Sequence, residues 1–218
     1  GLHPPDLCPV ADGGEGTAEV LLTRLGGFTG GASVSGPLGD PVTAGFAMLD
    51  AGGAAVVEVA AASGLTLVGE GRSDAEAATT TGTGELIIAA AAEGAQVIFV
   101  AAGGSATTDG GRGAIEAIEA GGGLQGVKLV VLCDVRTPWE RAADLFAPQK
   151  GADERAVTRL ADRLDAYASE LPRDPRGVPL TGAAGGLSGG LWAKYDAKLV
   201  SGAQFVLEEL DFDRRRTA

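Results

Sequence analysis

The chain is poor in the side chains that most often carry metal and nucleophilic chemistry. Its 218 residues include one histidine, His3, and two cysteines, Cys8 and Cys133. A single histidine leaves a zinc site or a Ser-His-Asp triad without its parts. The two cysteines show no CxxC spacing and lie in apolar, strand-like segments. We therefore predict two buried free thiols, which are typical of a reducing cytoplasm.

Basic residues and long apolar runs are scarce as well. Lysine and arginine number 17 against 29 aspartates and glutamates, so the formal charge is −12. Nucleic acids and anionic membranes require clustered positive charge, and we interpret the one basic run, residues 214–216, as a solvated tail. The sequence shows no signal peptide and no apolar run of ~18 residues. We therefore expect a cytoplasmic protein without a nucleic-acid or membrane partner.

Glycine, in contrast, is abundant, with 36 residues but no collagen-like period and only 10 prolines. This composition favours an α/β protein with many tight strand–helix loops. The alternation of apolar runs and helical spacing predicts a mixed sheet with flanking helices, with some parallel pairing and an antiparallel portion over 28–62. The expected strands are 6–11, 28–36, 41–49, 54–62, 96–102 and 128–135. The expected helices are 17–27, 85–94, 112–121, 153–171, 187–200 and 202–212. We expect residues 171–190 to form a long loop facing a ligand.

Four loops share one design, in which an apolar run ends in Gly, Ser or Thr plus an acid and a helix then begins. They are ADGGEGT (11–17), ATTTGTGE (78–85), AGGSATTDGG (102–111) and CDVRTP (133–138). Helix N-termini present unpaired N–H groups, and glycine lets these groups converge on anionic oxygens. Helix capping, for example by Thr81 or Thr83, explains any single loop equally well. No loop matches a P-loop or a dinucleotide fingerprint.

Three aspartates, Asp12, Asp109 and Asp134, lie at or just after the ends of apolar runs. Carboxylates that converge on an anion site need a cation, and Mg²⁺ with phosphate is the simplest solution. One aspartate could instead act as a general base, or each could cap a turn. Lys150, in a loop bounded by Pro and Gly, suits a charge on a transferring phosphoryl group; the alternative is a solvated loop lysine. Arg72 and Arg136 are weaker candidates of the same kind.

Seven motifs occur in the order found in bacterial glycerate kinases of the type-1 family, which the chain resembles over residues 8–212. They are PVADGGEGT (9–17), VEVAAASGL (57–65), TTTGTGELI (79–87), GGSATTDGGRG (103–113), LCDVRTPW (132–139), FAPQKGA (146–152) and GAAGGLSGGL (182–191). The resemblance implies phosphorylation of D-glycerate with ATP and Mg²⁺, in a cleft between two α/β domains. It leaves open whether the 2- or the 3-hydroxyl accepts the phosphate, and whether the protein is a homo-oligomer.

The resemblance also implies a set of site residues at the matching positions. The catalytic candidates are Asp12, Asp109, Asp134 and Lys150, with Asp134 also the candidate metal ligand. The candidates for binding substrate or phosphate are Glu15, Thr83, Gly103, Gly104, Ser105, Thr107 and Thr108.

Two segments of the family pattern, a DSFKGS-like loop and a GEGR-D-like motif, are not found in this sequence. We therefore expect residues 8–212 to be mainly the middle domain of the two-domain fold, with 213–218 as a tail. Three hypotheses follow: a glycerate kinase, a catalytically incomplete domain that binds a ligand or partner, and a kinase for another small acid.

Overall fold

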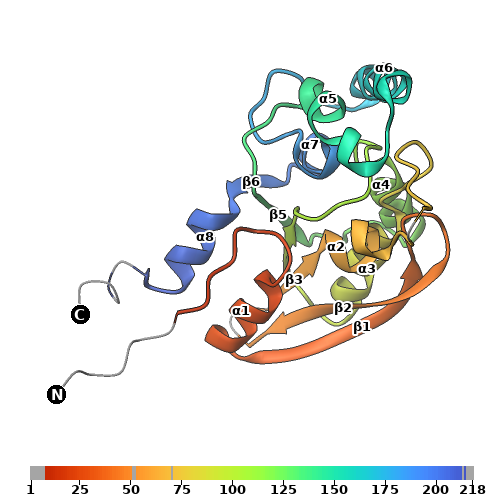
Figure 1. Cartoon of the computed structure of the whole chain (residues 1–218). Helices are drawn as coiled ribbons and strands as arrows, with labels where there is room; N and C mark the ends of the chain where they lie inside the picture. The colour runs from red at the N-terminus through yellow and green to blue at the C-terminus, as the bar shows by residue number, and fades with distance from the viewer. Residues whose placement is uncertain (1–7, 51–52, 70, 213, 215–218) are drawn as a thin grey trace.

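A six-stranded mixed sheet forms the centre of the molecule in the computed structural model, which describes residues 8–50, 53–69, 71–212 and 214. Its strands follow chain order: β1 (Gly27–Ser35), β2 (Pro41–Leu49), β3 (Ala54–Glu58), β4 (Val97–Ala101), β5 (Lys128–Cys133) and β6 (Lys198–Ser201). The first three strands form an antiparallel meander, and β3 to β6 pair in parallel (Figure 1). The predicted α/β class and mixed sheet are confirmed.

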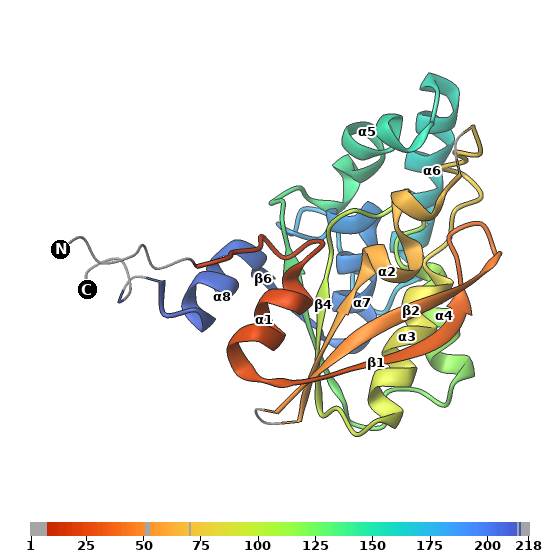
Figure 2. The ribbon, with the colours of Figure 1, turned by 60° about the horizontal axis from the view of Figure 1, so that its bottom comes forward.

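Helices cover both faces of this sheet (Figure 2). They are α1 (Thr17–Leu25), α2 (Val59–Ser63), α3 (Thr81–Ala92), α4 (Arg112–Ala120), α5 (Ala142–Phe146), α6 (Glu154–Glu170), α7 (Leu187–Tyr195) and α8 (Gly202–Glu209). Because right-handed crossovers advance in one direction from β3 to β6, their connecting helices lie on one face. Helices α1 and α8 lie on the other face. Within the described ranges, none of the helices is long and apolar enough to cross a bilayer.

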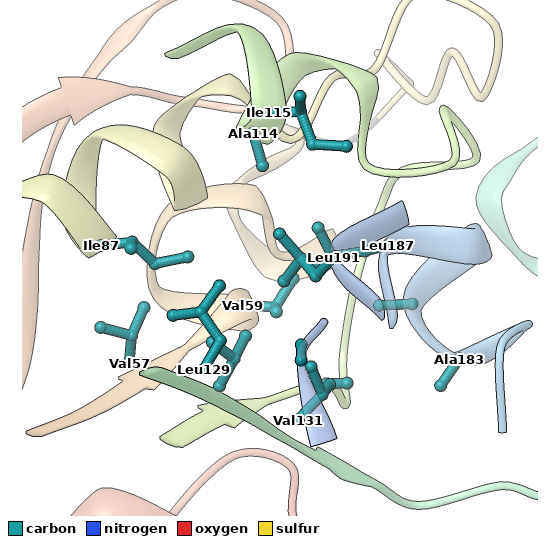
Figure 3. Close-up of a cluster of buried hydrophobic side chains, with 14 of the residues drawn as sticks. Val57, Val59, Ile87, Ala114, Ile115, Leu129, Val131, Ala183, Leu187 and Leu191 are labelled. Carbon is teal, nitrogen blue, oxygen red and sulfur yellow. The ribbon is translucent and has the colours of Figure 1, made fainter. Parts of the chain in front are cut away.

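Alternate residues of β2, β3 and β4 enter two separate cores. Val57 of β3 and Val131 of β5 belong to the larger core beneath α2 to α7, where Ile87 and Leu191 meet them (Figure 3). The neighbouring Val56 belongs to a smaller core under α1 and α8. The period of two along a strand produces this division, and it fixes the register of the parallel strands.

Several predicted boundaries are wrong. The third strand ends at Glu58, and the next five residues form α2. The helix expected over 187–200 ends at Tyr195, because Asp196 adopts a left-handed conformation with φ 55°, and residues 198–201 then form β6. No strand occurs over residues 8–11 of the segment expected at 6–11.

The predicted thiols and terminal segments have different outcomes. Cys133 is 2% exposed at the end of β5, as predicted, whereas Cys8 is half-buried and outside the core. His3 and the predicted tail over 213–218 lie outside the described residues, apart from Arg214.

Candidate active site

The loop that follows β4 presents a row of backbone N–H groups. An isolated bridge between Gly64 and Ser105 holds it in place, with Leu65 N donating to Gly104 O at 2.9 Å. In the described part of the chain, the N–H groups of Gly103, Gly104 and Ser105 donate to no protein acceptor. Gly104 has φ +69°, a conformation that glycine adopts without strain. The loop therefore offers consecutive donors to an anionic oxygen.

Lys150 brings a positive charge to this loop from 45 residues further along the chain. Its side chain is buried, with 3% of the residue exposed, and its Nζ donates to Ser105 Oγ at 3.0 Å and to Thr107 O. Burial lowers the pKa of Lys150 from 10.5 to about 8, although the carboxylates of Asp109 and Asp134 oppose this shift. The alternative interpretation of Lys150 as a solvated loop lysine is therefore wrong.

Two carboxylates lie beside the loop, at a place where two backbone segments touch. If residue 103 carried a Cβ atom, that atom would lie 2.6 Å from Gly14 Cα and 3.6 Å from Asp134 Oδ2. A Cβ on Gly14 would lie 3.2 Å from Asp12 Oδ1, which accepts the Gly14 N–H at 3.1 Å. Only glycine permits this approach, and it gathers Asp12 and Asp134 around the loop.

Asp134 follows the last residue of β5 directly and is held in an environment that disfavours its charge. Burial raises the pKa of its carboxyl group above the ordinary value, and the neighbouring carboxylate of Asp12 adds to the rise. Lys150 acts in the opposite direction. A cation between Asp12 and Asp134 would relieve this repulsion.

A cavity of about 310 Å³ opens between these groups at the carboxyl ends of β4 and β5. Parallel α/β sheets gather their ligands at this edge. Its lining includes the polar residues Ser105, Asp134, Gln149 and Lys150 and the apolar residues Leu65 and Phe146. Ala184 and Gly185 also line it, so part of the loop expected over 171–190 does face the cavity.

Asp109 does not line this cavity. Its carboxylate accepts hydrogen bonds from Thr80 N at 2.9 Å, Thr80 Oγ1 at 2.8 Å, Gly111 N at 3.0 Å and Gly113 N at 3.2 Å. These bonds cap α4 and join it to the start of α3. The capping alternative describes the contacts of Asp109, and the structure gives its predicted catalytic role no support.

The threonines predicted for phosphate binding are all fully buried. Thr83 Oγ1 shares a hydrogen bond of 2.8 Å with Ser63 Oγ, and neither residue lines the cavity. The hydroxyls of Thr107 and Thr108 have no hydrogen-bond partner among the residues described. The Thr108 carbonyl accepts from Arg163 at 3.0 Å. These side chains belong to the packing behind the loop.

Glu15 also lies close to this loop. A Cβ on Gly104 would lie 3.7 Å from Glu15 Oε2. Glu15 also lines an open hollow with Glu58, whose pKa is raised by burial and secondarily by the charge of Glu15. Glu58 accepts the N–H of Ala18 at 2.9 Å and so supports the start of α1.

Sequence reasoning missed Leu65, Phe146 and Gln149 as lining residues. Each lies within a motif already singled out: Leu65 is the last residue of VEVAAASGL, and Phe146 and Gln149 both precede Lys150 in FAPQKGA. Arg72, a weaker candidate, pairs instead with Asp40 at 2.8 Å on the surface. No group of three or more His, Cys, Asp or Glu side chains with metal-binding geometry occurs in the ranges that the structure covers.

Comparisons with known proteins identify the family. The Glycerate kinase family matches residues 4–122 and 119–218. Three relatives each align with 94% of this chain and 63% of their own length: glycerate kinase of Halalkalibacterium halodurans, 38% identical, glycerate 2-kinase of Escherichia coli K12, 38%, and glycerate kinase of Bacillus subtilis, 40%. A crystal structure described as a glycerate kinase 2 from Salmonella typhimurium LT2 superimposes with a TM-score of 0.86 at 34% identity, covering 95% of this chain and 65% of that one. The chain thus spans less than two thirds of the length of these relatives. By both sequence and fold, it belongs to the glycerate kinase family.

Proposed function

We propose that this chain carries the phosphoryl-transfer site of a kinase that phosphorylates D-glycerate with ATP and Mg²⁺ in the cytoplasm. The names of its relatives support the substrate. One observation carries the placement of the site: the buried Nζ of Lys150 contacts Ser105 Oγ beside three unpaired backbone donors, at the carboxyl edge of the sheet. The extent of the middle domain, residues 8–212, stays a prediction.

The loop and Lys150 together suit the charge that develops during phosphoryl transfer. N–H groups fixed by the fold need no reorganisation when phosphate oxygens gain charge, and a buried cation acts strongly on them because little water screens it. With a pKa of about 8, Lys150 is protonated at neutral pH. Glycine at 103 and 104 lets the backbone approach the phosphate closely.

Asp134 is our candidate for the general base, with Asp12 as the alternative. A base must lie beside the acceptor hydroxyl and have a pKa moved toward the working pH. Asp134 lines the cavity, and burial raises its pKa in this direction. It would hold the proton that the glycerate hydroxyl loses.

The neighbouring carboxylates of Asp12 and Asp134 are of the kind that holds magnesium. Mg²⁺ in phosphate sites typically takes one or two carboxylates and completes its octahedron with phosphate oxygens and water. If Asp12 is the base, Asp134 would be the protein ligand of the ion; if Asp134 is the base, Asp12, which lies close to it across the contact of Gly14 and Gly103, would hold the ion instead. When bound, the ion would neutralise phosphate charge.

A coupled assay of ADP release tests this proposal. Wild type should turn over with D-glycerate, ATP and Mg²⁺, whereas Lys150→Met and Asp134→Asn should each lose at least about 100-fold in kcat. Lys194→Met is a matched control, because Lys194 pairs with Glu119 at 3.7 Å on the surface of α7. Turnover that survives Lys150→Met would overturn the site. Absence of turnover in wild type would refute the kinase activity of this chain.

A further inference from the structure

The cavity beside Lys150 has an apolar part that neither glycerate nor phosphate can use. Leu65, Val135 and Phe146 line it together with the polar groups already described. They come from three separate segments. Leu65 begins the 3₁₀ turn Leu65–Leu67, Val135 is the second residue after β5, and Phe146 is the last residue of α5. All three are half-buried, so their side chains retain surface that a ligand can cover.

The chemistry of the two substrates differs at this surface. Every carbon of glycerate bears oxygen, so glycerate offers no apolar face. A nucleotide has a flat base that favours aromatic and aliphatic contacts. At about 310 Å³ the cavity is at the lower end of the size range of ligand sites, which is more than a three-carbon acid needs.

We propose that Leu65 and Phe146 bind the nucleotide base and that the amide of Gln149 meets a polar edge of the base. This inference rests on the proposed function and assigns the nucleotide to a particular part of the site. Leu65 N donates to Gly104 O at 2.9 Å. This backbone hydrogen bond holds Leu65 next to the loop that is proposed to bind the phosphates. Phe146 precedes Lys150 by one helical turn, so one short segment supplies both the base contact and the phosphate charge.

Binding measurements with two ligands separate the base from the phosphates. The probes are Mg-ATP and Mg-tripolyphosphate, which carries the phosphate chain without a nucleoside. Phe146→Ala should raise the Kd for Mg-ATP about tenfold or more, because a stacked base contributes that much, and should leave the Kd for tripolyphosphate unchanged. Leu65→Ala should likewise raise the Kd for Mg-ATP.

Leu145→Ala is the matched control, because Leu145 is the neighbour of Phe146 on α5, is 50% exposed and does not line the cavity. It should bind both ligands as wild type does. Equal losses for both ligands in Phe146→Ala would mean that the ring only supports the loop, and this would overturn the inference.

The same titrations distinguish failure of the inference from failure of the proposed function. If Lys150→Met weakens both ligands while Phe146→Ala changes neither, the phosphate site stands and the base subsite is refuted. If wild type binds neither ligand, the proposed kinase site fails and the base subsite fails with it.

Discussion

The buried amine of Lys150 should make the stability of this protein depend on pH in a way that one substitution removes. Lys150→Met keeps the length of the side chain and deletes its charge. The pKa of Lys150 is about 8 in the folded protein and 10.5 when it is freely solvated. Between these values the unfolded chain holds a proton that the folded chain has released.

The sign and size of the effect follow from this difference. Stability rises with pH wherever the unfolded state binds more protons. The contribution of Lys150 to the free energy of unfolding is therefore fully present above pH 10.5 and is lost as the pH falls from 10.5 through about 8. Each pH unit inside this window corresponds to about 1.4 kcal/mol. From neutral pH to about one unit below the upper pKa, wild type should therefore gain about 2 kcal/mol relative to Lys150→Met.

Urea denaturation of both proteins across this pH range measures the effect. All other titrating groups are common to the two proteins and cancel in the difference between their free energies of unfolding. The difference should move in favour of wild type as the pH rises. A difference that stays constant with pH would show that Lys150 is solvated, and would refute the burial on which the proposed site depends.

Three further predictions concern the same loop and its support. Gly103→Ala should lower the free energy of unfolding by about 1–3 kcal/mol in urea titrations, because its Cβ would lie 2.6 Å from Gly14 Cα; an unchanged midpoint would contradict this contact. Asp109→Asn should cost about 2 kcal/mol, because it weakens charge-assisted bonds to Thr80 and the start of α4, and should move the fall of kcat/KM to lower pH, because the Asp109 carboxylate raises the pKa of Lys150; unchanged stability would contradict these bonds. In wild type, kcat/KM should fall as the pH rises through about 8, since Lys150 then loses its proton; a flat profile there would argue against a cationic role.

The main architecture followed from patterns that are local in the sequence. The run QVIFV predicted β4, and the glycine-rich segment after it predicted a loop at a strand end, because apolar period and turn residues act over a few positions. Strand β6 was missed because its four residues are too few for a period to show, and a left-handed Asp196 separates them from α7.

The roles of single side chains depended on contacts that span the chain. Sequence pattern placed Asp109 and Asp134 alike, after apolar runs, yet the N–H groups of α4 occupy the first while the second lines the cavity. Whether Lys150 was solvated or buried was undecidable locally, since its partner Ser105 lies 45 residues away. Phe146 had no signal of its own, because a half-buried aromatic side chain beside a cavity has the same sequence pattern as one in a core.

The most direct test of the proposed site is a crystal structure of the chain with Mg²⁺ and a non-hydrolysable ATP analogue. The account predicts phosphate oxygens within hydrogen-bond distance of the N–H groups of residues 103–105 and of Lys150 Nζ, with the base against Phe146. An analogue bound elsewhere, with this loop and Lys150 unchanged and without a ligand, would contradict it.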